Sequence, residues 1–307
     1  ARMWDIEGNK YIDVTMGFGV NLLGHNPPFV TDAIAARLAQ GMQLGPQAEL
    51  AGEVAELVCE LTGNERTAFV NTGTEAVMIA CRLARAAAGR DLIVIFNGAY
   101  HGQHESTIVV VDPDDPECRA LPGVPGVTAQ SIANTVMLNY ADDAALAWIA
   151  RNADRIAGVM VEPVQSRQPE LRPREFLHAL RALTERHGIA LIFDEMLIGF
   201  RCHLGGAQAL FDVRADLVTY GKIVGGGLPI GVISGRRAFM DVIDGGAWTY
   251  GDASYPMVET TFVSGTHSKH PLTMAAAHAV LTHLKAQGPK LQDRLNARTA
   301  AFAERLN

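Results

Sequence analysis

Short runs of apolar, mostly β-branched residues recur along this chain, and segments with a helical pattern separate several of them. The apolar runs occupy residues 67–70, 92–96, 107–111, 135–138, 156–161, 189–193, 216–220 and 230–234. Helical patterns occupy residues 31–40, 47–61, 74–88, 142–151, 174–187 and 271–286. Short strands that alternate with amphipathic helices are typical of an α/β sheet. The chain is therefore predicted to have an α/β fold.

The clearest helix covers residues 74–88. Thr74 is the expected N-cap, Glu75 would lie in the first turn, and Gly89 would end the helix. Residues 112–126 hold several prolines and are predicted to be a surface excursion. Residues 287–307 begin another amphipathic helix and then stop, so the chain is expected to be truncated.

Composition narrows the class of protein. With 307 residues, of which 48% are hydrophobic, the chain can bury a large core, as a globular enzyme does. Its formal net charge is −7 and it has no run rich in lysine or arginine, which argues against nucleic-acid or anionic-membrane partners. No apolar stretch is long enough to span a bilayer and no signal pattern is present, so a cytoplasmic location is expected.

Residues 67–76 read T-A-F-V-N-T-G-T-E-A, a strand followed by a small polar turn and a helix start. The free N–H groups at such a helix start could hold a phosphate, with Gly73 permitting close approach and Thr74 offering a hydroxyl. Most junctions of this kind bind nothing, and simple helix capping is the competing interpretation.

Two charged side chains follow buried strands. Asp194 comes at the end of I-A-L-I-F-D-E (189–195), where α/β sheets bind ligands. Alternatively, Asp194 or Glu195 caps the next helix or pairs with Arg201. Lys222 lies 28 residues further on, in D-L-V-T-Y-G-K-I-V-G-G-G (216–227). A lysine in so apolar a setting is suited to a Schiff base with an aldehyde cofactor, although it could also extend to solvent.

Tyr100 and His101 follow another strand, in F-N-G-A-Y-H-G (96–102). The tyrosine ring could stack on a flat heterocycle at the same edge of the sheet, although a packed loop tyrosine is the more common case. A phosphate cradle, a stacking ring, a carboxylate for a ring nitrogen and an amine for an aldehyde together describe a pyridoxal-5′-phosphate (PLP) site.

The chain also resembles a known family. It is similar to class III, fold-type I aminotransferases, in the branch close to glutamate-1-semialdehyde 2,1-aminomutase. The motifs that carry the resemblance are W-D-I-E-G-N-K-Y-I-D (4–13), G-H-N-P-P (24–28), N-T-G-T-E-A (71–76), Y-H-G (100–102), V-E-P (161–163), F-D-E (193–195), G-K-I-V-G-G-G (221–227) and S-G-T (264–266).

The resemblance implies a fold and a domain division. The fold is the fold-type I transferase fold, with a large domain built on a mostly parallel mixed sheet flanked by helices. Residues 1–45 would be an N-terminal segment, 46–286 the large PLP-binding domain, and 287–307 the start of a small C-terminal domain that is largely missing.

The resemblance also implies roles for the site residues, as follows. Lys222 holds the cofactor, Asp194 pairs with the pyridine nitrogen, and Tyr100 stacks on the ring. His101 is a further cofactor-binding residue. Met196 supplies apolar packing against the other ring face. The phosphate is bound by Thr72, Gly73 and Thr74, and by Gly265 and Thr266 of the neighbouring subunit. The active site would therefore be shared across a homodimer.

A narrower resemblance is to aminotransferase domains of hybrid polyketide/non-ribosomal peptide synthases. It rests on T-M-G-F-G-V-N-L-L-G-H (15–25), E-P-V-Q-S-R-Q-P-E-L-R-P-R-E-F-L (162–177) and S-G-T-H-S-K-H-P-L (264–272). It implies transfer of an amino group from an amino-acid donor to a β-ketoacyl chain on an acyl carrier protein.

Three other interpretations stay open. A glutamate-1-semialdehyde-type aminomutase would use the same residues but return the amine to the same molecule. A non-catalytic dimerisation module is disfavoured, because Lys222, Asp194 and Tyr100 are all present. A dinucleotide-binding enzyme is weaker still, because Gly225-Gly226-Gly227 lacks the G-x-G-x-x-G spacing.

Overall fold

The centre of the molecule is one seven-stranded sheet. The computed structural model describes residues 1–44, 49–115 and 117–306. The strand order is β3-β11-β10-β9-β8-β4-β7, in which β10, β9, β8, β4 and β7 are mutually parallel and β11 runs antiparallel to both of its neighbours. The strands are β3 (Arg66–Val70), β4 (Leu92–Phe96), β7 (Thr135–Leu138), β8 (Ile156–Val161), β9 (Ala190–Asp194), β10 (Leu217–Tyr220) and β11 (Gly231–Gly235). The predicted α/β fold with a mostly parallel mixed sheet is confirmed.

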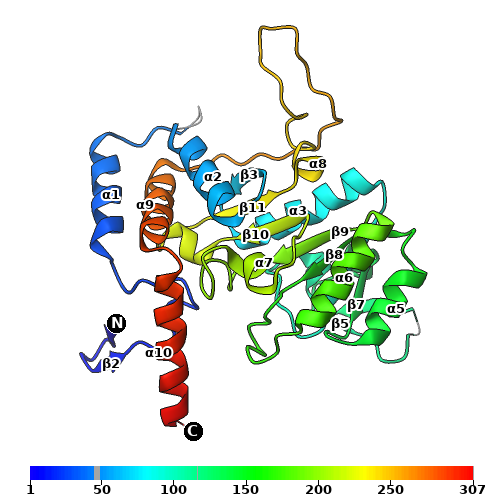
Figure 1. Cartoon of the computed structure of the whole chain (residues 1–307), viewed down its shortest axis with the longest axis horizontal. Helices are drawn as coiled ribbons and strands as arrows, with labels where there is room; N and C mark the ends of the chain where they lie inside the picture. Colours follow the sequence, from blue (N-terminus) through cyan, green and yellow to red (C-terminus); the bar gives the residue numbers. More distant parts are fainter. Residues whose placement is uncertain (45–48, 116, 307) are drawn as a thin grey trace.

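Helices cover both faces of this sheet (Figure 1). They are α1 (Pro28–Ala39), α2 (Glu49–Thr62), α3 (Gly73–Ala88), α4 (Ala129–Ile132), α5 (Asp143–Arg151), α6 (Arg174–His187), α7 (Gly206–Phe211), α8 (Arg237–Met240), α9 (Pro271–Gln287) and α10 (Lys290–Leu306). The helix expected at 47–61 begins at Glu49, and its first two residues lie outside the described residues, as does the domain boundary expected at 45/46. None of the helices in the described ranges has the length and apolarity to cross a bilayer.

Alternate side chains of each central strand enter two different cores. In β4, Ile93 and Ile95 pack with the α3 side, whereas Leu92, Val94 and Phe96 join the core that α2, α5, α6 and α9 contribute to. Successive side chains of a strand point to opposite faces, so a strand covered on both faces must be apolar throughout. This is why the sequence shows continuous apolar runs at these positions.

Two expectations from the sequence were wrong in detail. The run at 107–111 does not join the main sheet: β5 (Val109–Val111) pairs antiparallel with β6 (Ala120–Pro122), a strand that lies inside the expected surface excursion. Helix α3 is capped by Thr72 and not by Thr74. The Thr72 hydroxyl accepts from Glu75 N at 3.1 Å and Glu75 Oε2 accepts from Thr72 N at 2.9 Å, a reciprocal capping box.

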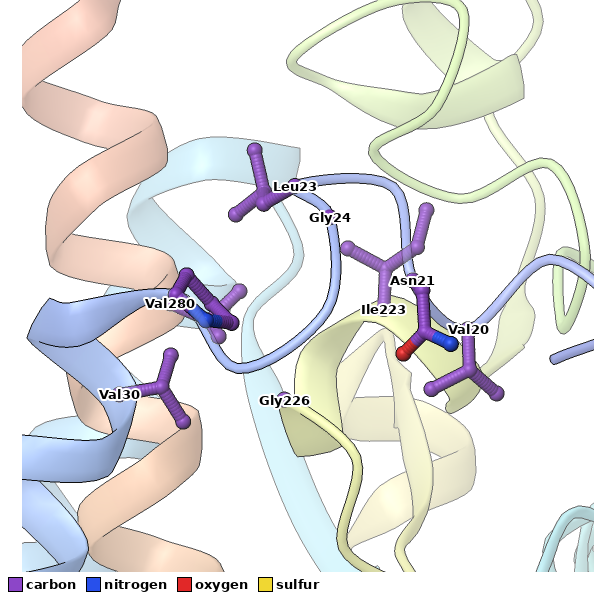
Figure 2. A pocket seen from close by; sticks show the side chains of 9 residues that line it. Val20, Asn21, Leu23, Gly24, Val30, Ile223, Gly226 and Val280 are labelled. Atoms are coloured by element: carbon purple, nitrogen blue, oxygen red, sulfur yellow. The ribbon is translucent and has the colours of Figure 1, made fainter. Parts of the chain in front are cut away.

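The N-terminal segment packs against the turn that carries Lys222. After the exposed hairpin of β1 (Arg2–Trp4) and β2 (Lys10–Ile12), the chain loops past the short 3₁₀ turn Lys222–Gly225 and enters α1, which packs against α9. Figure 2 shows Val20 and Asn21 of this loop beside Ile223. Val30 and Val280 lie close to Gly226, the glycine that follows the turn. Together these residues line a cavity of about 20 Å³. The turn is thus covered by a segment about 200 residues earlier in the sequence.

The segment between α8 and α9 leaves the body of the molecule. It forms a long loop that projects beyond α8 (Figure 1, golden). Its large apolar side chains are exposed, with exposed fractions of 93% for Tyr250 and 78% for Phe262. An apolar loop of this kind is typical of a surface that another chain covers.

Candidate active site

A large cavity opens at the carboxyl edge of the sheet. Its volume is about 1070 Å³, and residues that follow β3, β4, β8, β9 and β10 line it, as expected for ligand sites in α/β sheets. Eight residues expected at the site meet here: Thr72, Gly73, Thr74, Tyr100, His101, Asp194, Met196 and Lys222. Residues as far apart in the chain as Asn71 and Lys222 thus contribute to one site, because parallel strands end at the same edge.

One end of the cavity is the N-terminus of α3. A Cβ built on Gly73 would lie 2.9 Å from the Met196 side chain, so only glycine lets the helix start approach that side chain so closely. The Thr74 hydroxyl accepts from Gln103 N at 3.1 Å, which leaves its O–H free to donate to an anion. The first N–H groups of this 16-residue helix and its dipole favour negative charge at this point.

Asp194 lies at the floor of the cavity, at the end of β9, and is 2% exposed. Its Oδ1 accepts from Met196 N and from Thr219 Oγ1, both at 3.0 Å, and its Oδ2 lies 2.7 Å from Nδ1 of His101. Three partners leave one lone-pair position of the carboxylate free. Asp194 thus pairs with His101 and not with Arg201, which donates to the backbone oxygens of Leu197 and Gly19.

His101 is as deeply buried as its partner, at 3% exposed. Within the described part of the chain its Nε2 has no hydrogen-bond partner. With a proton on Nδ1, the ring would donate a hydrogen bond to Oδ2 of Asp194. The structure therefore places His101 at the cavity and in direct contact with Asp194, whose carboxylate it supports.

Glu195, unlike Asp194, caps a helix. It is buried, and its two oxygens accept from Ala207 N at 2.7 Å and from Gln208 N at 3.2 Å, in the first turn of α7. The interpretation of this carboxylate as a helix cap is confirmed for Glu195. Burial raises its pKa to about 8, against the lowering effect of the two N–H donors.

Lys222 begins the 3₁₀ turn after β10 and is half-buried at the cavity wall. Adjacent parallel strands bring it near Asp194, because Thr219 of β10 is paired with Asp194 of β9. Its φ of 42° is in the left-handed region, a conformation that costs a non-glycine residue about 1–3 kcal/mol. Across residues 1–44, 49–115 and 117–306 no carboxylate forms an ion pair with it, so its amine is free to react.

Gly265 and Thr266 do not line this cavity. They are exposed and lie just before α9, where a Cβ on Gly265 would be 3.4 Å from Asn71 Nδ2. Tyr100, which does line the cavity, is 53% exposed. Its ring is therefore accessible to a group bound in the cavity.

Several cavity residues had no assigned role from the sequence. Glu162, in the V-E-P motif, accepts from Tyr100 N at 3.3 Å and from Ser166 N at 3.0 Å, and burial, followed by the charge of Asp194, raises its pKa. Arg167, Phe18 and Val20 also line the cavity. Nothing in local periodicity marks these residues, because loops about 140 residues apart in the chain bring them together.

The sheet order, the carboxyl-edge cavity and the placement of Lys222 and Asp194 define a fold-type I PLP-dependent transferase fold. The model of the family "Aminotransferase class-III" matches residues 1–307. The chain belongs to the class III aminotransferase family. Members of this family depend on PLP, and the similar solved structures include a transaminase with PLP bound, with a TM-score of 0.82 and 32% identity over 92% of this chain and 65% of that one.

Individual relatives agree with this assignment. A glutamate-1-semialdehyde 2,1-aminomutase of Chloroflexus aggregans is 42% identical over 284 residues, which cover 92% of this chain and 62% of the relative. Among solved structures, an omega-transaminase from Sphaerobacter thermophilus has a TM-score of 0.85 at 30% identity, covering 94% of this chain and 65% of that one. A β-phenylalanine aminotransferase from Variovorax paradoxus has a TM-score of 0.84 at 31% identity, covering 100% and 65%. The chain thus spans about three fifths of the relative's length.

Proposed function

We propose that the protein is a PLP-dependent aminotransferase that moves an amino group from an amino-acid donor to a keto substrate. The observation that carries the proposal is the meeting of Lys222 and Asp194 with the N-terminus of α3 around one cavity. An amine, a buried carboxylate and an anion-binding helix end are the three groups that PLP requires. Residues 46–286 would form the cofactor-binding domain.

The residues present fit the cofactor. Gly73 and Thr74 would bind the phosphate at the start of α3, and Thr72 would hold that helix start in place. Tyr100 would stack on one face of the ring and Met196 would contact the other. The free lone-pair position of Asp194 would accept a hydrogen bond from the protonated pyridine nitrogen, and the hydrogen bond with His101 would hold that carboxylate in place.

When bound, PLP supplies an electron-withdrawing ring that takes up the negative charge developed at the substrate's Cα. The amine of Lys222 would hold the cofactor's aldehyde covalently until the donor amine replaces it. The released amine would then take the proton from Cα and deliver it to C4′. Asp194 would keep the pyridine nitrogen protonated throughout, which sustains the ring's capacity for charge.

For the acceptor, we propose a β-ketoacyl thioester carried by an acyl carrier protein. The stretches 162–177 and 264–272, which resemble the synthase-embedded aminotransferases, support it. The similarity to a β-phenylalanine aminotransferase is in keeping with amination at a β carbon. A large cavity with Phe18, Val20 and Leu197 in its wall offers apolar surface to an alkyl chain.

A second candidate activity is the isomerisation that the name of the Chloroflexus relative describes. The same lysine and aspartate would serve it, with the amine returned to a neighbouring carbon of one molecule. Product analysis with glutamate-1-semialdehyde and no added donor separates the two: 5-aminolevulinate formed at high turnover would favour the aminomutase.

We also propose a homodimer with shared sites. Gly265 and Thr266 lie outside the cavity of their own chain, and the apolar loop before them projects from the body (Figure 1). In a dimer, this region of one subunit would reach the phosphate end of the other subunit's cavity. A Gly-Thr pair would add backbone N–H groups and a hydroxyl there.

The test of the proposed activity is the visible absorbance of the purified protein with PLP. We expect a band from the covalently held cofactor in the wild type, its loss in Lys222→Ala, and bleaching by an amino-acid donor. Lys285→Ala is the matched control, because Lys285 forms an exposed pair with Glu60 at 2.6 Å and should not affect the band. Absence of a band in the wild type would contradict the proposal and favour a non-catalytic role.

A further inference from the structure

One cation at the cavity wall has no task in the chemistry above. Of the described residues that line the cavity, the charged side chains are Glu162, Arg167, Asp194 and Lys222. Asp194 and Glu162 accept hydrogen bonds from neighbouring groups, and Lys222 is assigned to the cofactor. Arg167 is exposed, and none of the hydrogen bonds or ion pairs found within the described ranges involves its guanidinium group.

Hydrogen bonds of the buried Gln165 fix the backbone of the turn that carries Arg167. Gln165 is 1% exposed, and its Nε2 donates to Asn97 O at 2.9 Å, which joins the loop after β8 to the loop after β4. Gln168 N donates to Gln165 O at 3.0 Å, so residues 165–168 form a turn with Arg167 inside it. The guanidinium therefore extends from a fixed base, which favours a defined contact over a freely moving surface charge.

Glu162 does not neutralise Arg167. Its Oε1 accepts from Ser166 N and its Oε2 from Tyr100 N, so both oxygens face backbone donors. Among the described lining residues, Arg167 is thus the one cation left for a substrate anion. A guanidinium group is planar and presents paired N–H donors that match the two oxygens of a carboxylate.

We propose that Arg167 binds the carboxylate of the amino-acid donor and so makes this cavity selective for amino acids over simple amines. The inference rests on the proposed aminotransferase function and extends it to donor recognition. Every α-amino acid carries this carboxylate, whereas a ketoacyl thioester carries none. Arg167 would act in the donor half of the reaction, while Phe18, Val20 and Leu197 offer an apolar wall to the uncharged acceptor.

The experiment compares two donors that differ only in the carboxylate. L-alanine and isopropylamine share the same amine-bearing carbon, but a methyl group replaces the carboxylate in isopropylamine. Bleaching of the holoenzyme's visible band gives the apparent dissociation constant and the maximal rate for each donor, and L-glutamate serves as a second amino acid. The variants are Arg167→Gln, Arg167→Lys and the control Arg172→Gln, which alters an exposed arginine outside the cavity.

In Arg167→Gln we expect affinity for both amino acids to fall about 10- to 100-fold, the loss typical of a hydrogen-bonded charge pair. Isopropylamine should react as in the wild type, because it has no carboxylate to lose. Arg167→Lys should recover part of the affinity, since it keeps the charge but not the paired donors. Arg172→Gln should match the wild type with all three donors.

Two results would overturn the inference. Unchanged affinity for L-alanine and L-glutamate in Arg167→Gln would show that the carboxylate binds elsewhere. An equal loss with isopropylamine would assign Arg167 to the fold or to the cofactor. Failure of the aminotransferase proposal looks different, because the wild-type holoenzyme would then be bleached by neither amino acid.

Discussion

At the scale of single residues, the candidate site depends on how Asp194 is held. Its side chain is buried and has three hydrogen-bond partners from three parts of the chain, namely His101, Thr219 and the backbone of Met196. Burying a carboxylate without such partners is costly. The three partners of Asp194 therefore fix its carboxylate in place and leave one lone-pair position free.

Asp194→Asn should keep the cofactor bound but lower the rate of the donor half-reaction about 10²- to 10³-fold, because a neutral amide does not hold a proton on the pyridine nitrogen. Stopped-flow absorbance with an amino-acid donor measures this rate. Asp216→Asn is the matched control, since that buried carboxylate pairs with Arg181 and Arg236, both at 2.8 Å, at the other edge of the sheet. It should lower stability and leave the half-reaction rate unchanged.

A near-normal rate in Asp194→Asn would contradict the role assigned to this carboxylate. The assignment of the fold would stand, because it rests on the sheet order and on the family match.

At the scale of elements, the residues that cap a helix determine which neighbouring side chains remain available to the site. Thr72 and Glu75 cap α3 reciprocally, which frees Thr74 to face Gln103 and the cavity. Glu195 caps α7 from the end of the adjacent strand. Two neighbouring carboxylates, Asp194 and Glu195, thus serve different elements because successive residues point to opposite sides of the chain.

The cap of α7 predicts a pH dependence of stability. The pKa of Glu195 is about 8 in the folded protein and 4.5 as its unperturbed value, so the folded state binds the extra proton between these pH values. The free energy of unfolding should therefore fall as pH rises from about 4.5 to 8, with a slope of at most about 1.4 kcal/mol per pH unit from this group. Urea denaturation from pH 5 to pH 9 measures it.

Glu195→Gln stays neutral and should flatten this decline. Its control is Glu65→Gln, which alters an exposed carboxylate that accepts from Arg237 N at 2.7 Å at the start of α8. The control should keep the wild-type slope. If Glu195→Gln keeps it as well, another buried group is responsible for the decline.

At the scale of the whole molecule, the site is formed where distant segments meet, and we propose that a second subunit completes it. The loop between α8 and α9 projects from the body and carries exposed Tyr250 and Phe262 (Figure 1). Gly265 and Thr266 follow that loop and do not line the cavity of their own chain. A C2 dimer would cover such a surface and place the same pair at both sites.

Subunit mixing tests the shared site. Lys222→Ala lacks the reactive amine, and Thr266→Glu should repel the phosphate, so each homodimer should be inactive. In a mixed dimer, one site has its own Lys222 and the partner's unaltered Thr266. Refolding an equal mixture should therefore restore about a quarter of wild-type activity, because half of the dimers are mixed and each has one intact site. No recovery would show that Thr266 serves its own chain.

By itself, the sequence determined the class of fold and indicated the candidate site residues. Unbroken apolar runs mark the strands of a sheet covered on both faces, and strand β8 (Ile156–Val161) and helix α6 (Arg174–His187) have the predicted bounds. Lys222 and Asp194 stand out because each is a charged residue at or just after the end of an apolar run. Such features are local, since burial and side-chain periodicity are read from neighbouring residues.

The tertiary structure alone decided which residues meet. It pairs Val109–Val111 with a strand from the proline-rich segment 112–126 and places His101 in contact with Asp194. It also makes Glu195 the cap of α7 and places Arg167 in the cavity wall. These partners are separated by up to 93 residues in the chain, as His101 and Asp194 are. Contacts across such separations depend on strand order and register, which local pattern does not specify.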